Sequence, residues 1–133
     1  MRIYDSLQGH LAQLIGRELH TLAQAKKFKI ERVLPKNKKQ VEWLIKLAVG
    51  SHGNEPSIYL TDILRVYTWM VESYWDKWAS VTDIKNYIST RKGFVSEKNA
   101  SYMMAILATF DDIESREGRG AAIKFKPKSM EYK

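Results

Sequence analysis

Apolar residues recur at three- and four-residue steps along the first part of the chain, the spacing of one face of an α-helix. Asp5 or Ser6 can cap the start of such a helix. The pattern predicts an N-terminal amphipathic helix over residues 5–24. Its apolar face consists of Leu7, Leu11, Leu14, Ile15, Leu19 and Leu22.

The next segment, residues 26–39, has no helical stripe and is interrupted by Pro35. We expect an extended basic connection there. Asn37 can cap a short helix over residues 38–49. The inward side chains of that helix would be Val41, Leu44, Ile45 and Ala48. Residues 51–57 then carry a loop signal.

The most apolar segment begins at Ser57 or Thr61 and ends at Lys77. Its apolar positions form a broad stripe at helical spacing, which is typical of a central, buried helix. An aromatic ladder can instead be a stacking platform for single-stranded bases. The many neighbouring aliphatic residues favour a place in the core. The stripe consists of Leu60, Ile63, Leu64, Val66, Tyr67, Trp69, Met70, Val71, Tyr74, Trp75 and Trp78.

Residues 78–127 predict two short helices followed by a hairpin. Ser80 to Asp83 is a helix-capping pattern, and a polar turn over residues 89–93 ends that helix. Ser96 can cap the second helix. Strand-like runs over residues 113–116 and 121–125 flank a turn that contains two glycines. The second helix has its apolar positions at Ala100, Met103, Met104, Leu107 and Phe110.

This order of elements resembles a winged helix-turn-helix over residues 60–127. The resemblance also rests on the run Val95-Ser96, Ala100-Ser101, Met104, Leu107, Phe110 and Ile113. It implies a mainly α fold: a winged helix-turn-helix with a C-terminal β-hairpin wing and an N-terminal amphipathic helix. We expect residues 1–36 to be the helix and basic linker, residues 37–127 the winged-helix domain and residues 128–133 a tail.

The charge of the chain favours a polyanionic partner. The net charge is +7, with +6 in residues 26–46 and +3 in residues 91–133, offset by −2 in residues 47–90. Clustered cations bind nucleic acid through release of its counterions. The chain has no cysteine, and its three histidines lack the spacing of metal ligands, so we expect no metal or other cofactor. Without a long apolar run or a signal peptide, a soluble, cytoplasmic protein is expected.

The resemblance implies that the second helix enters the major groove and that the hairpin contacts the backbone or minor groove. By position, the groove residues would be Lys98, Asn99, Ser101 and Tyr102. The backbone contacts would come from Arg91, Lys92, Arg116, Arg119, Lys124 and Lys126. The basic segment would add phosphate contacts from Lys26, Lys27, Lys29, Lys36, Lys38 and Lys39. The expected function is DNA binding, with double-stranded DNA favoured, in the regulation of transcription or replication.

The alternative is a non-catalytic protein–protein interaction module, an adaptor or inhibitor, that docks through Met103 and Ile106. A homodimer can also form through the leucine stripe of residues 7–22. We expect no enzyme and no catalytic residues. The only carboxylate cluster, made of Asp111, Asp112, Glu114 and Glu117, is typical of a solvated helix end.

Overall fold

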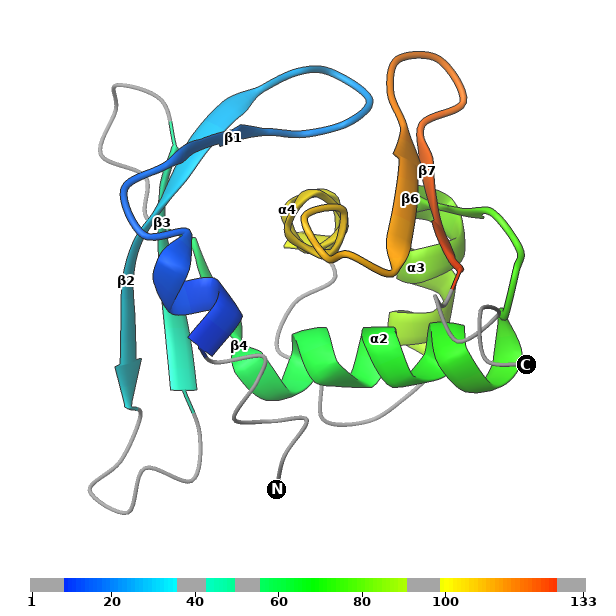
Figure 1. Ribbon diagram of the computed structural model, residues 1–133, viewed down its shortest axis with the longest axis horizontal. Coiled ribbons are helices and arrows are strands. Elements are labelled where there is room, and N and C mark those ends of the chain that lie inside the picture. The colour runs from blue at the N-terminus through cyan, green and yellow to red at the C-terminus, as the bar shows by residue number, and fades with distance from the viewer. Residues whose placement is uncertain (1–8, 36–42, 50–55, 91–98, 127–133) are drawn as a thin grey trace.

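The computed structural model describes residues 9–35, 43–49, 56–90 and 99–126. These residues form a mixed α/β fold with two antiparallel sheets (Figure 1). The expected mainly α fold is therefore wrong. The error lies in the first half of the chain, where strands replace the predicted helices.

The first sheet has the order β1-β2-β3-β4. Its strands are β1 (Glu18–His20), β2 (Lys27–Pro35), β3 (Trp43–Val49) and β4 (Ser57–Tyr59). Buried residues alternate with less buried ones along β2 and β3, because successive side chains of a strand point to opposite faces. Phe28 and Ile30 face the core from β2, and Ile45, Leu47 and Val49 face it from β3.

Three predicted elements of the first half are thus corrected. The N-terminal helix covers only residues 9–13 of the described chain. The backbone turns at Gly16, whose φ is +83° and whose N–H donates to the Ile30 carbonyl at 2.9 Å. Glycine adopts this conformation without a Cβ clash, so the helix ends there. In the predicted extended connection over residues 26–39, Lys27–Pro35 is extended but forms strand β2 of a sheet, and in the short helix predicted over 38–49, Trp43–Val49 is strand β3. Residues 36–42 lie outside the described residues.

The leucine stripe belongs to the core of this same chain. Leu11, Leu14 and Leu22 are each at most 6 % exposed, and Leu19 packs against the same core. These three buried side chains are therefore not available to the predicted dimer through residues 7–22. The boundary expected after residue 36 falls between β2 and β3, which pair with each other.

The second half contains elements where the sequence predicted them. They are α2 (Leu60–Ser73), α3 (Val81–Ser89), α4 (Ala100–Leu107), β6 (Ile113–Arg116) and β7 (Ala122–Phe125). The short strand β5 (Ala79–Ser80) was not predicted. The capping box predicted at Ser80 and Asp83 is confirmed, with each side chain bonded to the backbone of the other residue. The hairpin is also confirmed, and its strands form the second sheet in the order β5-β7-β6. Ser96 lies outside the described residues.

Helix α4 lies at the centre of the molecule. In Figure 1 it is seen end-on, with the first sheet to its left, α2 below it and the β6–β7 hairpin to its right. All of its residues except Ser101 are buried, from Ala100 to Leu107. The two sheets and α2 therefore share α4 as a common core element.

Helix α2 is less completely buried than its sequence predicted. Its buried residues are Leu60, Asp62, Ile63, Val66 and Met70. Of its aromatic side chains, Tyr67, Trp69 and Tyr74 are half-buried and pack against the core, whereas Trp75 beyond its end is exposed. The prediction that the aromatic ladder belongs to the core is therefore confirmed in part, and it is wrong for Trp75.

Candidate nucleic-acid interface

Two β-hairpins meet at their tips. The N-terminal hairpin consists of β1, β2 and the turn over residues 21–26, and the C-terminal hairpin consists of β6, β7 and the turn over residues 117–121. In Figure 1 the N-terminal hairpin reaches across the top of α4 toward the C-terminal one. The Gly118 N–H donates to the Leu22 carbonyl at 2.8 Å. The charged residues of the N-terminal turn and those of the C-terminal turn therefore belong to the same end of the molecule.

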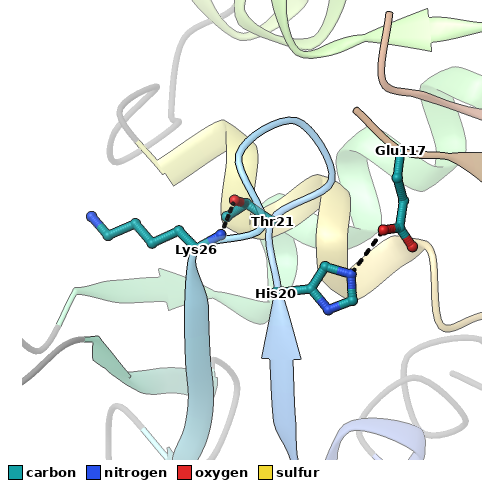
Figure 2. Close-up of polar contacts among 4 residues, drawn as sticks. All are labelled: His20, Thr21, Lys26 and Glu117. Carbon is teal, nitrogen blue, oxygen red and sulfur yellow. Dashed lines mark hydrogen bonds and ion pairs between the residues drawn. The ribbon is translucent and has the colours of Figure 1, made fainter. Parts of the chain in front are cut away.

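Side chains add a second contact between the tips. His20 Nε2 lies 3.1 Å from Glu117 Oε1, as Figure 2 shows. Both side chains are about half exposed, at 46 % for His20 and 59 % for Glu117. An exposed pair of this kind contributes little stability, about 0–1 kcal/mol. Its main effect is to keep the Glu117 carboxylate close to an imidazole.

Each turn has its own internal hydrogen bonds. The Thr21 hydroxyl accepts from the Lys26 N–H at 3.0 Å, and the Thr21 N–H donates to the Lys26 carbonyl at 3.0 Å. Figure 2 shows the Lys26 side chain pointing away from the His20–Glu117 pair. In the other turn, Gly118 and Gly120 have φ values near +80°. These bonds and conformations fix the turns in place.

The cations of the N-terminal hairpin lie on the outer face of the first sheet. Lys27 and Lys29 alternate with the buried Phe28 and are exposed, as is Lys26 in the turn. Lys27 is 75 % exposed and only approaches the Glu18 carboxylate, at 4.0 Å. Neither Lys26 nor Lys29 pairs with an acidic side chain among the described residues.

The four predicted cations of the C-terminal hairpin differ in their availability. Lys124 is only 18 % exposed and lies within 4.0 Å of both Asp76 and Glu114. Lys126 also lies 4.0 Å from Glu114. These two charges are partly neutralised by carboxylates.

The two arginines of this hairpin remain exposed. The Arg116 Nε donates to the Gly120 carbonyl at 2.9 Å, which holds its guanidinium beside the turn. Arg119 is exposed in the turn itself and pairs with no acidic side chain in the described part of the chain. We use the name hairpin-tip surface for the five exposed cations at this end: Lys26, Lys27, Lys29, Arg116 and Arg119.

The residues predicted to enter a groove are not gathered on an exposed face. Tyr102 is 9 % exposed and packs edge-on against Phe28 of β2, with ring centroids 5.0 Å apart. The half-buried Asn99 donates through Nδ2 to the Ser57 carbonyl at 3.0 Å. The first sheet thus covers the side of α4 that carries Tyr102. Lys36, Lys38, Lys39, Arg91, Lys92 and Lys98 lie outside the described residues.

The predicted apolar docking face is wrong. Met103 is 1 % exposed and Ile106 is fully buried, because α4 packs against neighbours on nearly all sides. These two side chains are part of the core and present no surface to a partner protein.

The predicted carboxylate cluster is divided among different partners. Asp112 accepts the Tyr67 hydroxyl hydrogen bond at 2.5 Å. Burial of Tyr67 and this hydrogen bond together raise the pKa of its phenol well above its usual value. Glu114 contacts lysines and Glu117 contacts His20. Within the described ranges, no group of three or more His, Asp or Glu side chains is arranged to hold a metal ion.

Sequence reasoning missed the aromatic and cationic contacts beside the C-terminal hairpin. The Arg116 guanidinium lies over the Trp78 ring at 4.4 Å from its centroid, and the Lys124 ammonium lies over the same ring at 4.8 Å. Trp75, nearby in the chain, is 46 % exposed. The only sequence signal is the aromatic ladder itself, whose exposed members cannot be identified without the packing of α2.

The sequence matches no protein-family model and no curated protein, and the fold matches no solved structure. The resemblance to winged-helix proteins therefore stays a prediction. None of the helices in the described ranges is both long and apolar enough to cross a membrane.

Proposed function

We propose that this chain binds nucleic acid through the phosphate backbone, using the hairpin-tip surface. The observation that supports this most strongly is the contact between the two turns, Gly118 to Leu22, which joins two turns that each carry exposed cations. Phosphate oxygens are the usual partners of such exposed lysines and arginines, and each contact releases a condensed counterion.

The charge balance at the tips favours an anionic partner. Four of the five cations (Lys26, Lys29, Arg116 and Arg119) pair with no acidic side chain among the described residues. The nearby acids have partners of their own, since Glu18 approaches Lys27 and Glu117 contacts His20. The tips therefore carry an excess of uncompensated positive charge on two anchored turns.

Because α4 is buried, the proposed binding does not involve insertion of this helix into a DNA groove. The preference for double-stranded DNA depends on α4 entering the major groove, whereas Tyr102 of α4 packs on Phe28 instead. Backbone contacts from exposed hairpins require no helix in a groove and carry no sequence information of their own. We propose a non-catalytic binding protein whose affinity is mainly electrostatic; regulation of transcription or replication stays a prediction.

The salt dependence of binding tests the proposal. We would measure binding of a fluorescent oligonucleotide between roughly 50 and 200 mM salt for the wild type and for the triple variant Lys26→Ala, Lys29→Ala, Arg119→Ala. Removing one cation that neutralises a phosphate changes the log–log slope by about 0.9 on duplex DNA, or by about 0.7 on a single strand. The triple variant should therefore have a slope shallower by about 2 to 3.

A matched control carries Arg17→Ala and Lys85→Ala, two exposed cations that belong to neither hairpin turn. This control should keep the wild-type slope. Equal slopes for the wild type and the triple variant would exclude the hairpin-tip surface. Absence of any binding at low salt would exclude nucleic-acid binding altogether.

A further inference from the structure

A second surface lies beside the C-terminal hairpin, at the end of α2. We call it the aromatic surface, and its members are Trp69, Tyr74, Trp75, Trp78 and Tyr87. Four of them are half-buried and Trp75 is 46 % exposed. Trp69 stacks on Tyr87 with centroids 4.8 Å apart and an interplanar angle of 13°, and it lies 4.6 Å from Tyr74. Trp69, Tyr74 and Tyr87 thus form a connected group of rings, while Trp75 and Trp78 follow Tyr74 closely in the chain.

Cations lie over this group of rings. The Arg116 and Lys124 side chains lie over Trp78, and the Lys77 ammonium lies 5.7 Å from the centroid of Tyr74. The neighbouring acidic side chains, Asp76 and Glu114, both lie within 4.0 Å of Lys124. Lys77 and Arg116 are exposed and form no ion pair with any residue of the described ranges. The aromatic surface is therefore positively charged at its edges.

A tight turn presents Trp75. The Lys77 N–H donates to the Tyr74 carbonyl at 3.1 Å, and the Asp76 N–H donates to the Phe125 carbonyl at 3.2 Å. Asp76 has a φ of +60°, the left-handed conformation that closes such a turn. This turn is thereby anchored to the end of β7. Trp75 contacts no other aromatic ring among the described residues, and it is 46 % exposed.

We propose that the aromatic surface stacks unpaired nucleobases, with Trp75 as the principal contact, so that the preferred partner is a single-stranded nucleic acid. This inference rests on the proposed function and specifies its substrate class. Every nucleobase has a π face, and surface aromatics beside cations bind single strands by stacking. In a duplex those faces are occupied by neighbouring bases, so a surface ring cannot stack on them.

Arg116 connects the two surfaces. It belongs to the hairpin-tip surface and also lies over Trp78 of the aromatic surface. A single strand whose phosphates lie along the hairpin tips can therefore place its bases over the rings. The combination of uncompensated cations with exposed rings matches the two parts of a nucleotide, an anionic backbone and a flat apolar base. An apolar protein partner has no corresponding need for these cations.

The test compares single-strand and duplex binding by Trp75 variants of the full chain. The probes are an oligothymidine strand, an oligouridine strand and a duplex, each of about 20 nucleotides and fluorescently labelled, within the usual site sizes of single-strand binders. Trp75→Ala should weaken binding of the preferred single strand about tenfold and leave duplex binding unchanged. Trp75→Phe, which keeps a ring, should restore most of the affinity. Because Trp75 is half exposed, the variants should fold normally, which circular dichroism would verify.

Ile15→Ala is the matched control, since Ile15 is the other large exposed hydrophobic side chain of the described residues, at 43 %. It should bind the single strand like the wild type. If Trp75→Ala binds the single strand as tightly as the wild type does, or weakens duplex binding equally, the stacking inference is wrong. In those cases salt-sensitive binding by the wild type would leave the proposed function standing. No binding to any probe at low salt would overturn both proposals.

Discussion

Replacement of Tyr102 by alanine tests whether the first sheet covers α4. The ring is 9 % exposed and packs edge-on against Phe28, with centroids 5.0 Å apart and planes at 74°. Removing a large buried aromatic side chain costs about 3–5 kcal/mol of unfolding free energy. The aromatic pair accounts for about 0.5–1.5 kcal/mol of that cost. A Tyr102 that faced solvent or a DNA groove would change stability by only about 0.5 kcal/mol.

Urea unfolding followed by circular dichroism measures this difference. With a slope of about 2 kcal/mol/M, a decrease of about 3 kcal/mol or more lowers the midpoint by about 1.5 M or more. Tyr102→Phe is the matched control, because the Tyr102 hydroxyl forms no hydrogen bond with any described residue and the ring is retained. A double-mutant cycle with Phe28→Ala should give a coupling of about 0.5–1.5 kcal/mol. A Tyr102→Ala midpoint within about 0.3 M of the wild type would refute the packing of this sheet on α4.

Three further predictions concern local stability. Gly16→Ala should destabilise the fold by more than about 1 kcal/mol, because the φ of +83° at this position disfavours any side chain. Gly9→Ala, in the helical segment, should not destabilise it, and the unfolding midpoints of the two variants compare them. Ser80→Ala should cost about 1 kcal/mol by removing the cap of α3, and Ser80→Asp, which keeps an acceptor oxygen, should destabilise less in the same assay. Burial lowers the pKa of His10 below 6.5, so its neutral form is the stable one in the fold. Stability should therefore fall as the pH drops below about 6.5; midpoints measured at pH 7.5 and 5.5 should differ less in His10→Gln, and an unchanged pH dependence in that variant would contradict this.

The sequence could predict the second half of the fold because its signals are local. The Ser80 cap, the apolar positions of α3 and the two glycines of the C-terminal turn each specify structure within a few residues. Alternation around Ile123 likewise identifies strand β7. In these segments, local propensity and tertiary packing agree.

The first half could not be predicted because two periodicities overlap there. Leu11 and Leu14 continue in helical register to Leu19 and Leu22, yet the chain turns at Gly16 and the later leucines reach the same core from a strand and a turn. Only a sheet partner distant in sequence decides between these outcomes. In β2, Phe28 and Ile30 alternate with lysines, as expected of a strand with one buried face. The many lysines instead led to the prediction of a basic linker.

The candidate site could be predicted only in part. The exposed cations at Lys26, Lys27 and Arg119 are predicted from the sequence to bind nucleic acid, but nothing in the sequence indicates that the turns carrying them meet. The apolar character of α4 fits a core helix as well as one that packs on a partner. The position of Tyr102 under a sheet from the other half of the chain decides between these in favour of the core.

The most direct test of nucleic-acid binding at the hairpin tips is an NMR titration of the ¹⁵N-labelled chain with an oligothymidine strand at about 50 mM salt. We expect the amide signals of residues 20–29 and 116–120, together with the Trp75 indole N–H, to shift during the titration while the amides of α4 stay in place. Shifts centred on α4, or no shift at the two turns, would contradict it.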